Sequence, residues 1–141
     1  MFNDIFLPCI ALVSLTSLIW AMTVYKRIQE MRVNRISPQS LATSRGVSSL
    51  LKNSQASDNF SNLFELPVLF YILCLALEVT HETTLGYVVA AWIFVLLRTL
   101  HSLIQVTSNR VTYRFFAWLL SSICLFGMWG NFATDRICSV T

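Results

Sequence analysis

The feature that most constrains this chain is the distribution of its apolar residues into four long stretches. They cover residues 5–25, 63–77, 83–106 and 115–134, and the first and last contain no Asp, Glu, Lys or Arg. A helix needs about 20 residues to cross the hydrocarbon core of a bilayer, which each stretch reaches with its flanks. None of them shows the alternation of a membrane β-barrel. The pattern therefore predicts four transmembrane helices.

The polar segments between these stretches predict the domain organisation. Only 12% of the residues are charged, whereas soluble domains have about a quarter. We expect one all-α domain over residues 1–141, an integral membrane four-helix bundle. Its helices should span about 4–35, 58–79, 83–107 and 110–134, with a cytoplasmic loop over about 36–57. The first stretch lacks a basic leader and is longer than a signal-peptide core, so we expect it to be retained as a helix.

Charged residues outside the stretches predict the orientation in the membrane. The two connections expected on one side carry most of the basic residues: Lys26, Arg27, Arg32, Arg35, Arg45, Lys52, Arg110 and Arg114. The other side carries Asp4, Glu78, Glu82 and Asp135, with Arg136 as its basic residue. By the positive-inside rule the basic loops are cytoplasmic and both termini lie outside. Such loops favour anionic lipids as a partner over nucleic acid. The cysteines have no metal-ligand spacing, so no metal site is predicted.

A first group of polar side chains lies at the start of the second helix. At about 100° per residue, Asp58, Asn62 and Glu65 fall within a sector of roughly 60°, with Asn59 at its edge. Pro67 cannot donate to the carbonyl one turn earlier, which predicts a kink. A carboxylate and amides at the mouth of an apolar helix require a partner, a ligand or water.

A second group lies on the third helix. Arg98, His101 and Gln105 are spaced i, i+3 and i+7, so they also share one face. Antiparallel packing of the two helices brings both groups to one depth on the cytoplasmic side. Two interpretations stay open. The groups can form a pocket that binds a ligand, or Glu65 and Arg98 can form an intramembrane ion pair that fixes the helix register, with Asn62 and His101 satisfying it.

Several short motifs follow one another in a recognisable order. They are Asn62-Leu-Phe-Glu65 followed by Leu-Pro67, then Ala91-Trp92, Arg98-Thr-Leu-His101 and Asn109-Arg-Val-Thr-Tyr113. In this order and topology the chain resembles the MAPEG family, the membrane-associated proteins in eicosanoid and glutathione metabolism, and within it the small bacterial members. The resemblance covers the second to fourth helices. It implies a multi-pass protein of the bacterial inner membrane that assembles as a homotrimer.

The resemblance also implies a ligand and its residues. Glutathione would lie between neighbouring protomers, open to the cytoplasm, as a cosubstrate held by Asn62, Glu65, Arg98 and His101. The position of the arginine that faces the sulfur in several members is Asn109 here, so the neighbouring Arg110 is the candidate catalytic residue, with Arg114 and Arg98 as alternatives. Further candidate binding residues are Asn59, Tyr113 and Arg114. The arginines would clamp the carboxylates, Glu65 would pair with the ammonium, and a guanidinium would favour the thiolate.

The chain also departs from the family pattern. Asp58, Asn59 and Ser61 stand where basic residues usually precede the Asn-x-x-Glu motif, and Gln105 replaces a tyrosine. Two functions therefore stay open, and with them whether the protein is an enzyme. One is a glutathione-dependent transferase or peroxidase that acts on a lipophilic small molecule. The other is a non-catalytic protein that binds a lipid or fatty acid in the same inter-subunit cleft. A transporter ranks third, since four helices without a broken pair argue against it.

Overall fold

The computed structural model describes residues 4–41 and 55–140, and its regular elements are all helical. Residues 42–54, with the basic Arg45 and Lys52 of the predicted cytoplasmic loop, lie outside the described ranges. The elements in chain order are α1 (Phe6–Val33), the 3-10 helix η1 (Pro38–Leu41), α3 (Gln55–Asn62), α4 (Leu66–Val79), α5 (Leu85–Val106) and α6 (Val111–Val140).

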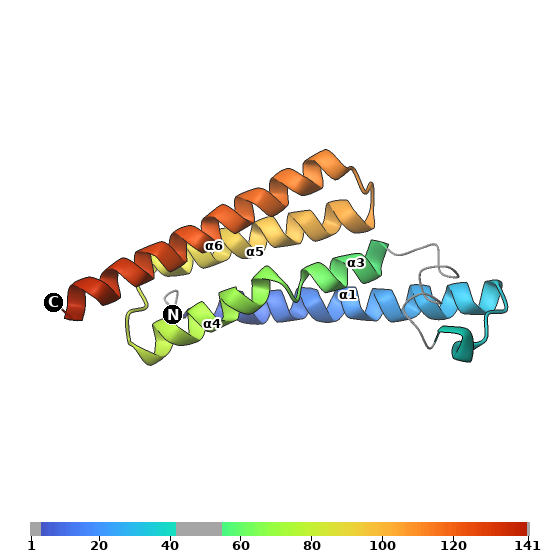
Figure 1. Cartoon of the computed structure of the whole chain (residues 1–141), viewed down its shortest axis with the longest axis horizontal. Coiled ribbons are helices and arrows are strands. Elements are labelled where there is room, and N and C mark those ends of the chain that lie inside the picture. The colour runs from blue at the N-terminus through green and yellow to red at the C-terminus, as the bar shows by residue number, and fades with distance from the viewer. Residues whose placement is uncertain (1–3, 42–54, 141) are drawn as a thin grey trace.

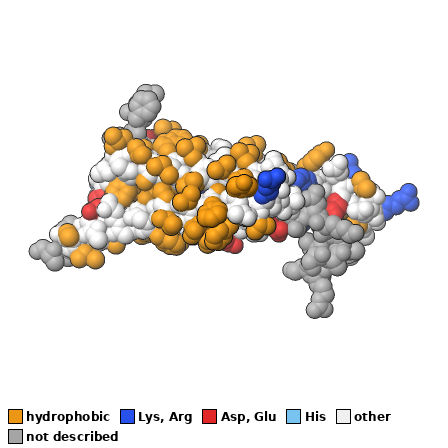
Figure 2. Space-filling view, turned by 90° about the horizontal axis from the view of Figure 1, so that it is seen from above, with side chains coloured by type: hydrophobic (Ala, Val, Ile, Leu, Met, Phe, Trp, Pro, Cys, Tyr) orange, Lys and Arg blue, Asp and Glu red, His pale blue; other side chains and the backbone are white. Residues whose placement is uncertain are grey.

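Within the described part of the chain, four helical stretches are long and apolar enough to cross a membrane: α1, α3 with α4, α5 and α6. Large hydrophobic side chains point outward along them; Leu18, Leu96 and Ile123 are each at least 60% exposed. On the face in Figure 2, hydrophobic side chains cover the middle of the molecule. This outward apolar surface is typical of a protein whose solvent is lipid.

The helices form two layers that run along the long axis (Figure 1). α5 and α6 form an antiparallel hairpin, and α1 lies beside α3 and α4. Both termini lie at one end of the bundle, and the α5–α6 turn lies at the other. The core between the layers is apolar; the rings of Phe70 and Phe94 stack with their centroids 4.7 Å apart.

The second membrane stretch is broken rather than kinked. α3 ends at Asn62, a turn covers residues 63–65, and α4 begins at Leu66. Pro67 has no N–H for the carbonyl of Leu63, so the helical ladder cannot continue there. The break corrects the expected polar face, which assumed a continuous helix. Asp58 and Glu65 are exposed, whereas Asn59, predicted at the edge of that face, is fully buried.

The last helix continues past the predicted end at residue 134, as far as Val140. Two polar contacts hold these final turns against the start of α5 and the turn before it. The hydroxyl of Tyr87 donates to the carboxylate of Asp135 at 3.0 Å, and Arg136 forms an ion pair with Glu82 at 3.0 Å. α6 therefore continues beyond its apolar stretch because its last polar residues have partners at the start of α5 and in the turn before it.

Candidate functional site

A group of polar side chains lies inside the bundle where α3 meets the second half of α5, and we call it the polar cluster. Its members are Asn59, Asn62, Arg98, His101, Ser102 and Gln105. All except the half-buried Asn62 are buried. The two polar groups predicted from helical spacing therefore meet in space, near the end of the bundle that holds the α5–α6 turn.

Side-chain amides and a hydroxyl join α3 to α5. The amide of Asn59 donates to the carbonyl of Ser102 at 3.4 Å, and the hydroxyl of Ser102 donates back to Asn59 Oδ1 at 3.1 Å. The amide of Asn62 donates to Gln105 Oε1 at 3.2 Å. These bonds satisfy one edge of the polar cluster, so Asn59 and Ser102 hold the two helices in register.

Arg98 occupies the centre of the polar cluster and is fully buried. Its Nη2 donates to the backbone carbonyl of Asn62. That carbonyl would accept from Leu66 in a continuous helix, and the break at 63–65 leaves it for the arginine. The other two nitrogens, Nε and Nη1, are buried and have no hydrogen-bond partner within the described ranges. A buried cation thus presents two unused donors.

His101 lies one turn further along α5 and is also incompletely paired. Its Nδ1 is 3.0 Å from the backbone carbonyl of Arg114 on α6. A carbonyl only accepts, so Nδ1 carries the proton and Nε2 of the neutral ring is an acceptor. Nε2 is buried and, among the described residues, makes no hydrogen bond of good geometry, although the side chain of Gln105 lies beside the ring. The polar cluster therefore offers unused donors from Arg98 beside an unused acceptor from His101.

Glu65 lies at the break between α3 and α4, on the surface of the protomer. Its charge acts on the guanidinium of Arg98, but no nitrogen of Arg98 lies within ion-pair distance of its carboxylate among the described residues. The protomer alone therefore does not form the intramembrane Glu65–Arg98 ion pair that was one of the two interpretations of these residues. Glu65 instead presents an exposed carboxylate next to the polar cluster.

The remaining candidates lie at the start of α6. Arg114 donates through Nη1 to Asn109 Oδ1 at 2.9 Å, and it reaches His101 only through its backbone carbonyl. Arg110 and Tyr113 are exposed. No hydrogen bond in the described part of the chain joins either side chain to the polar cluster. The structure thus brings Asn59, Asn62, Arg98 and His101 together and leaves Glu65, Arg110 and Tyr113 on the protomer surface.

Ser102 is a member of the polar cluster that sequence reasoning missed. It lies four residues after Arg98, so helical spacing alone puts it on the same face. A serine in an apolar helix usually bonds to its own backbone, as Ser122 does with Trp118. The sequence signal that could have identified Ser102 is Asn59 on the facing helix, a polar side chain that can serve as its hydrogen-bond partner.

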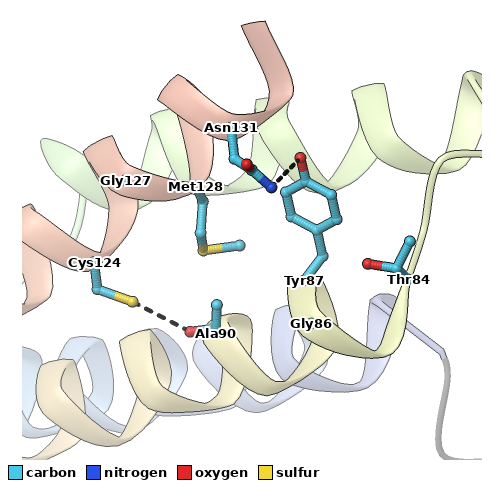
Figure 3. A pocket seen from close by; sticks show the side chains of 8 residues that line it. All are labelled: Thr84, Gly86, Tyr87, Ala90, Cys124, Gly127, Met128 and Asn131. Carbon is cyan, nitrogen blue, oxygen red and sulfur yellow. Dashed lines mark hydrogen bonds between the residues drawn. The ribbon is translucent and has the colours of Figure 1, made fainter. Parts of the chain in front are cut away.

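A separate pocket of about 420 Å³ lies between α5 and α6, at the end of the bundle that holds the termini (Figure 3). Gly86, Gly127 and Ala90 leave the space open, while Asn131 donates to the hydroxyl of Tyr87 at 3.2 Å. The thiol of Cys124 donates to the carbonyl of Ala90 at 3.4 Å. Tyr87, Asn131 and Cys124 each make a hydrogen bond here and the lining contains no charged side chain, so this pocket lacks the buried charge that Arg98 gives the polar cluster.

Comparison with known proteins identifies one family. The model of the MAPEG family matches residues 5–134, nearly the whole chain. No curated protein and no solved structure matches the chain. The match includes the broken second stretch and every member of the polar cluster.

Proposed function

This chain belongs to the MAPEG family of integral membrane proteins, and from that premise we propose that it is a glutathione-dependent transferase or peroxidase acting on a lipophilic substrate. Glutathione binds between protomers of a homotrimer, near the cytoplasmic side of a bacterial inner membrane. The basic loops face the cytoplasm and both termini lie outside.

The observation that carries this proposal is the unpaired state of Arg98. Leaving a buried donor without a partner costs about 1–3 kcal/mol, and Arg98 has two such donors. A carboxylate of glutathione would satisfy them with charge-assisted hydrogen bonds. The unused Nε2 of His101 would accept a hydrogen bond from an N–H of the same peptide.

The exposed candidates supply the reason for a site between protomers. Glu65, Arg110 and Tyr113 lie on the surface, where a second protomer can cover them. In the proposed complex Glu65 pairs with the ammonium of glutathione, and Arg110 faces its sulfur. A guanidinium at the sulfur favours the thiolate over the thiol. The thiolate then attacks an electrophilic carbon and forms a thioether as the leaving group departs. Alternatively it attacks a hydroperoxide oxygen, which breaks the O–O bond and gives a sulfenic acid and an alcohol, and a second glutathione converts the sulfenic acid to a disulfide and water.

A second function is favoured by one specific observation. Asn59 stands where relatives carry a basic residue, and its side chain is already bonded to Ser102. The protomer therefore has fewer groups for a tripeptide with two carboxylates than the family pattern implies. A single fatty-acid carboxylate would suffice to satisfy Arg98. In this alternative the protein holds a lipid or fatty acid in the same cleft without chemistry.

Glutathione titration of Glu65→Gln tests the proposal. The substitution keeps the shape and removes the charge opposite the ammonium. A charged hydrogen bond contributes about 1.5–3 kcal/mol, so affinity should fall about ten- to a hundredfold. Since Glu65 is exposed in the protomer, melting without ligand should change little. Glu78→Gln is the matched control, because Glu78 is also exposed but lies at the far end of α4.

Mass spectrometry of molecules that co-purify with the protein separates the two functions. Glutathione in the preparation, with affinity lost in Glu65→Gln, supports the enzyme. A co-purifying fatty acid together with no glutathione binding at millimolar concentration rejects the enzyme and supports the lipid-binding alternative. Unchanged glutathione affinity with a lowered melting point in Glu65→Gln rejects the ammonium-anchoring role.

A further inference from the structure

Two cysteines from different helices meet near the end of the bundle that holds the termini. The side chains of Cys9 on α1 and Cys74 on α4 are neighbours in the apolar core, and both are reduced. Cys74 is fully buried in the apolar core, whereas Cys9 is half-buried and packs against that core. This thiol pair has no role in the chemistry proposed for glutathione.

A second contact fixes the register of the same two helices. Tyr71, one turn before Cys74 on α4, has the side chain of Thr16 on α1 as its neighbour. α1 and α4 therefore touch at two polar points along their seam. Because the two thiols are neighbours across this seam, a bond between them requires a local adjustment to an S–S length of about 2.05 Å rather than a rearrangement of helices.

We propose that Cys9 and Cys74 form a reversible disulfide that ties α1 to α4. At a rise of about 1.5 Å per residue, the two cysteines lie within roughly 5–8 Å of the ends of their helices. That end of the bundle is the one proposed to face the outside, where oxidising conditions let disulfides persist. Cys9 is the more exposed partner, so an oxidant reaches it first.

The chemistry is thiol–disulfide exchange with a small disulfide, such as oxidised glutathione. The deprotonated Cys9 sulfur attacks one sulfur of the oxidant, which forms a mixed disulfide and releases one thiolate. The Cys74 sulfur loses its proton, attacks the Cys9 sulfur and displaces the second thiolate. Two protein thiols are oxidised, the oxidant's disulfide is reduced to two thiols, and the two protons from the protein end on them.

The structure also selects this pair over the others that four cysteines allow. Cys124 lies on α6, and its thiol donates to the carbonyl of Ala90 on α5 rather than to another thiol. Cys138 is exposed near the end of α6. Neither of them shares the α1–α4 seam, so an oxidant should join Cys9 to Cys74 and leave Cys124 reduced.

The test uses the full chain in lipid nanodiscs, treated with oxidised glutathione and then with a thiol-blocking reagent under denaturing conditions. Peptide mass spectrometry should find the peptide of Cys9 linked to that of Cys74, and two fewer blocked thiols per chain. The melting temperature should rise by several degrees on oxidation, because the bond closes a long loop of the unfolded chain. Reduction should reverse both changes.

Three variants complete the experiment. Cys9→Ser and Cys74→Ser should lose the linked peptide and the shift in melting temperature. Cys124→Ser, a matched control in the same half of the bundle, should keep both. The proposal is overturned if the oxidised wild type yields no Cys9–Cys74 peptide, or links either residue mainly to Cys124 or Cys138. The peptide map is measured on the wild type, so it decides the proposal even if a cysteine variant fails to fold.

Discussion

Replacing Arg98 by methionine separates a ligand-binding arginine from a structural one. The side chain is fully buried, makes one hydrogen bond to the carbonyl of Asn62 and leaves two donors unpaired. In Arg98→Met the two unpaired donors disappear, each having cost about 1–3 kcal/mol. The lost charged bond is worth about 1.5–3 kcal/mol, and the freed carbonyl costs about 1–3 kcal/mol.

These terms nearly cancel, so the ligand-free variant should unfold within about 2 kcal/mol of the wild type. Arg98 has no ion-pair partner among the described residues, so the change leaves no buried charge unpaired, and apolar replacement that leaves none is often neutral. The ligand should make the difference. Saturation at about a hundred times the dissociation constant stabilises a protein by about 2.7 kcal/mol, and Arg98→Met should lose this stabilisation.

The assay is thermal unfolding in detergent, with and without glutathione, for the wild type and Arg98→Met. Arg136→Met is the control, because Arg136 forms an exposed ion pair with Glu82, and such pairs contribute about 1 kcal/mol or less. A ligand-free Arg98→Met protein destabilised by more than about 3 kcal/mol, with an unchanged glutathione-dependent shift, would refute the reasoning. Arg98 would then be a structural residue.

Three further predictions concern the sulfur, the α3–α5 contact and the orientation. Arg110→Ala should lower the fraction of bound thiolate, measured by ultraviolet absorbance at neutral pH, more than it lowers affinity; equal losses would remove Arg110 from the sulfur. Asn59→Ala leaves the hydroxyl of Ser102 unpaired and should destabilise the protein by about 1–3 kcal/mol in thermal unfolding, whereas Ser61→Ala on the exposed face should not. In a Cys138→Ser background, an impermeant thiol reagent added outside should label Glu78→Cys and spare Ser108→Cys; the reverse pattern would invert the topology.

Much of this architecture could be predicted because the bilayer imposes a simple rule on sequence. Residues 5–25 and 115–134 lack charge, and this pattern suffices to indicate membrane helices. The meeting of Asn62 with the face of Arg98 followed from helical periodicity and a short connection between antiparallel helices. Both arguments use only local geometry.

The sequence predicted a kink where the structure has a break at 63–65, because a proline alone allows either one. In the structure Arg98 takes the carbonyl of Asn62, and this partner lies far away in the sequence. The burial of Asn59 rather than Asp58 has the same origin, since it depends on Ser102 of another helix. Long-range pairing of polar groups therefore decided the features that local patterns left open.

Native mass spectrometry of the protein released from nanodiscs in the presence of glutathione tests the proposed inter-subunit site most directly. The proposal predicts trimers that carry glutathione, with the bound mass lost in Glu65→Gln and kept in Glu78→Gln. Monomers that retain glutathione, or trimers that bind none at millimolar concentration, would contradict a glutathione site between protomers.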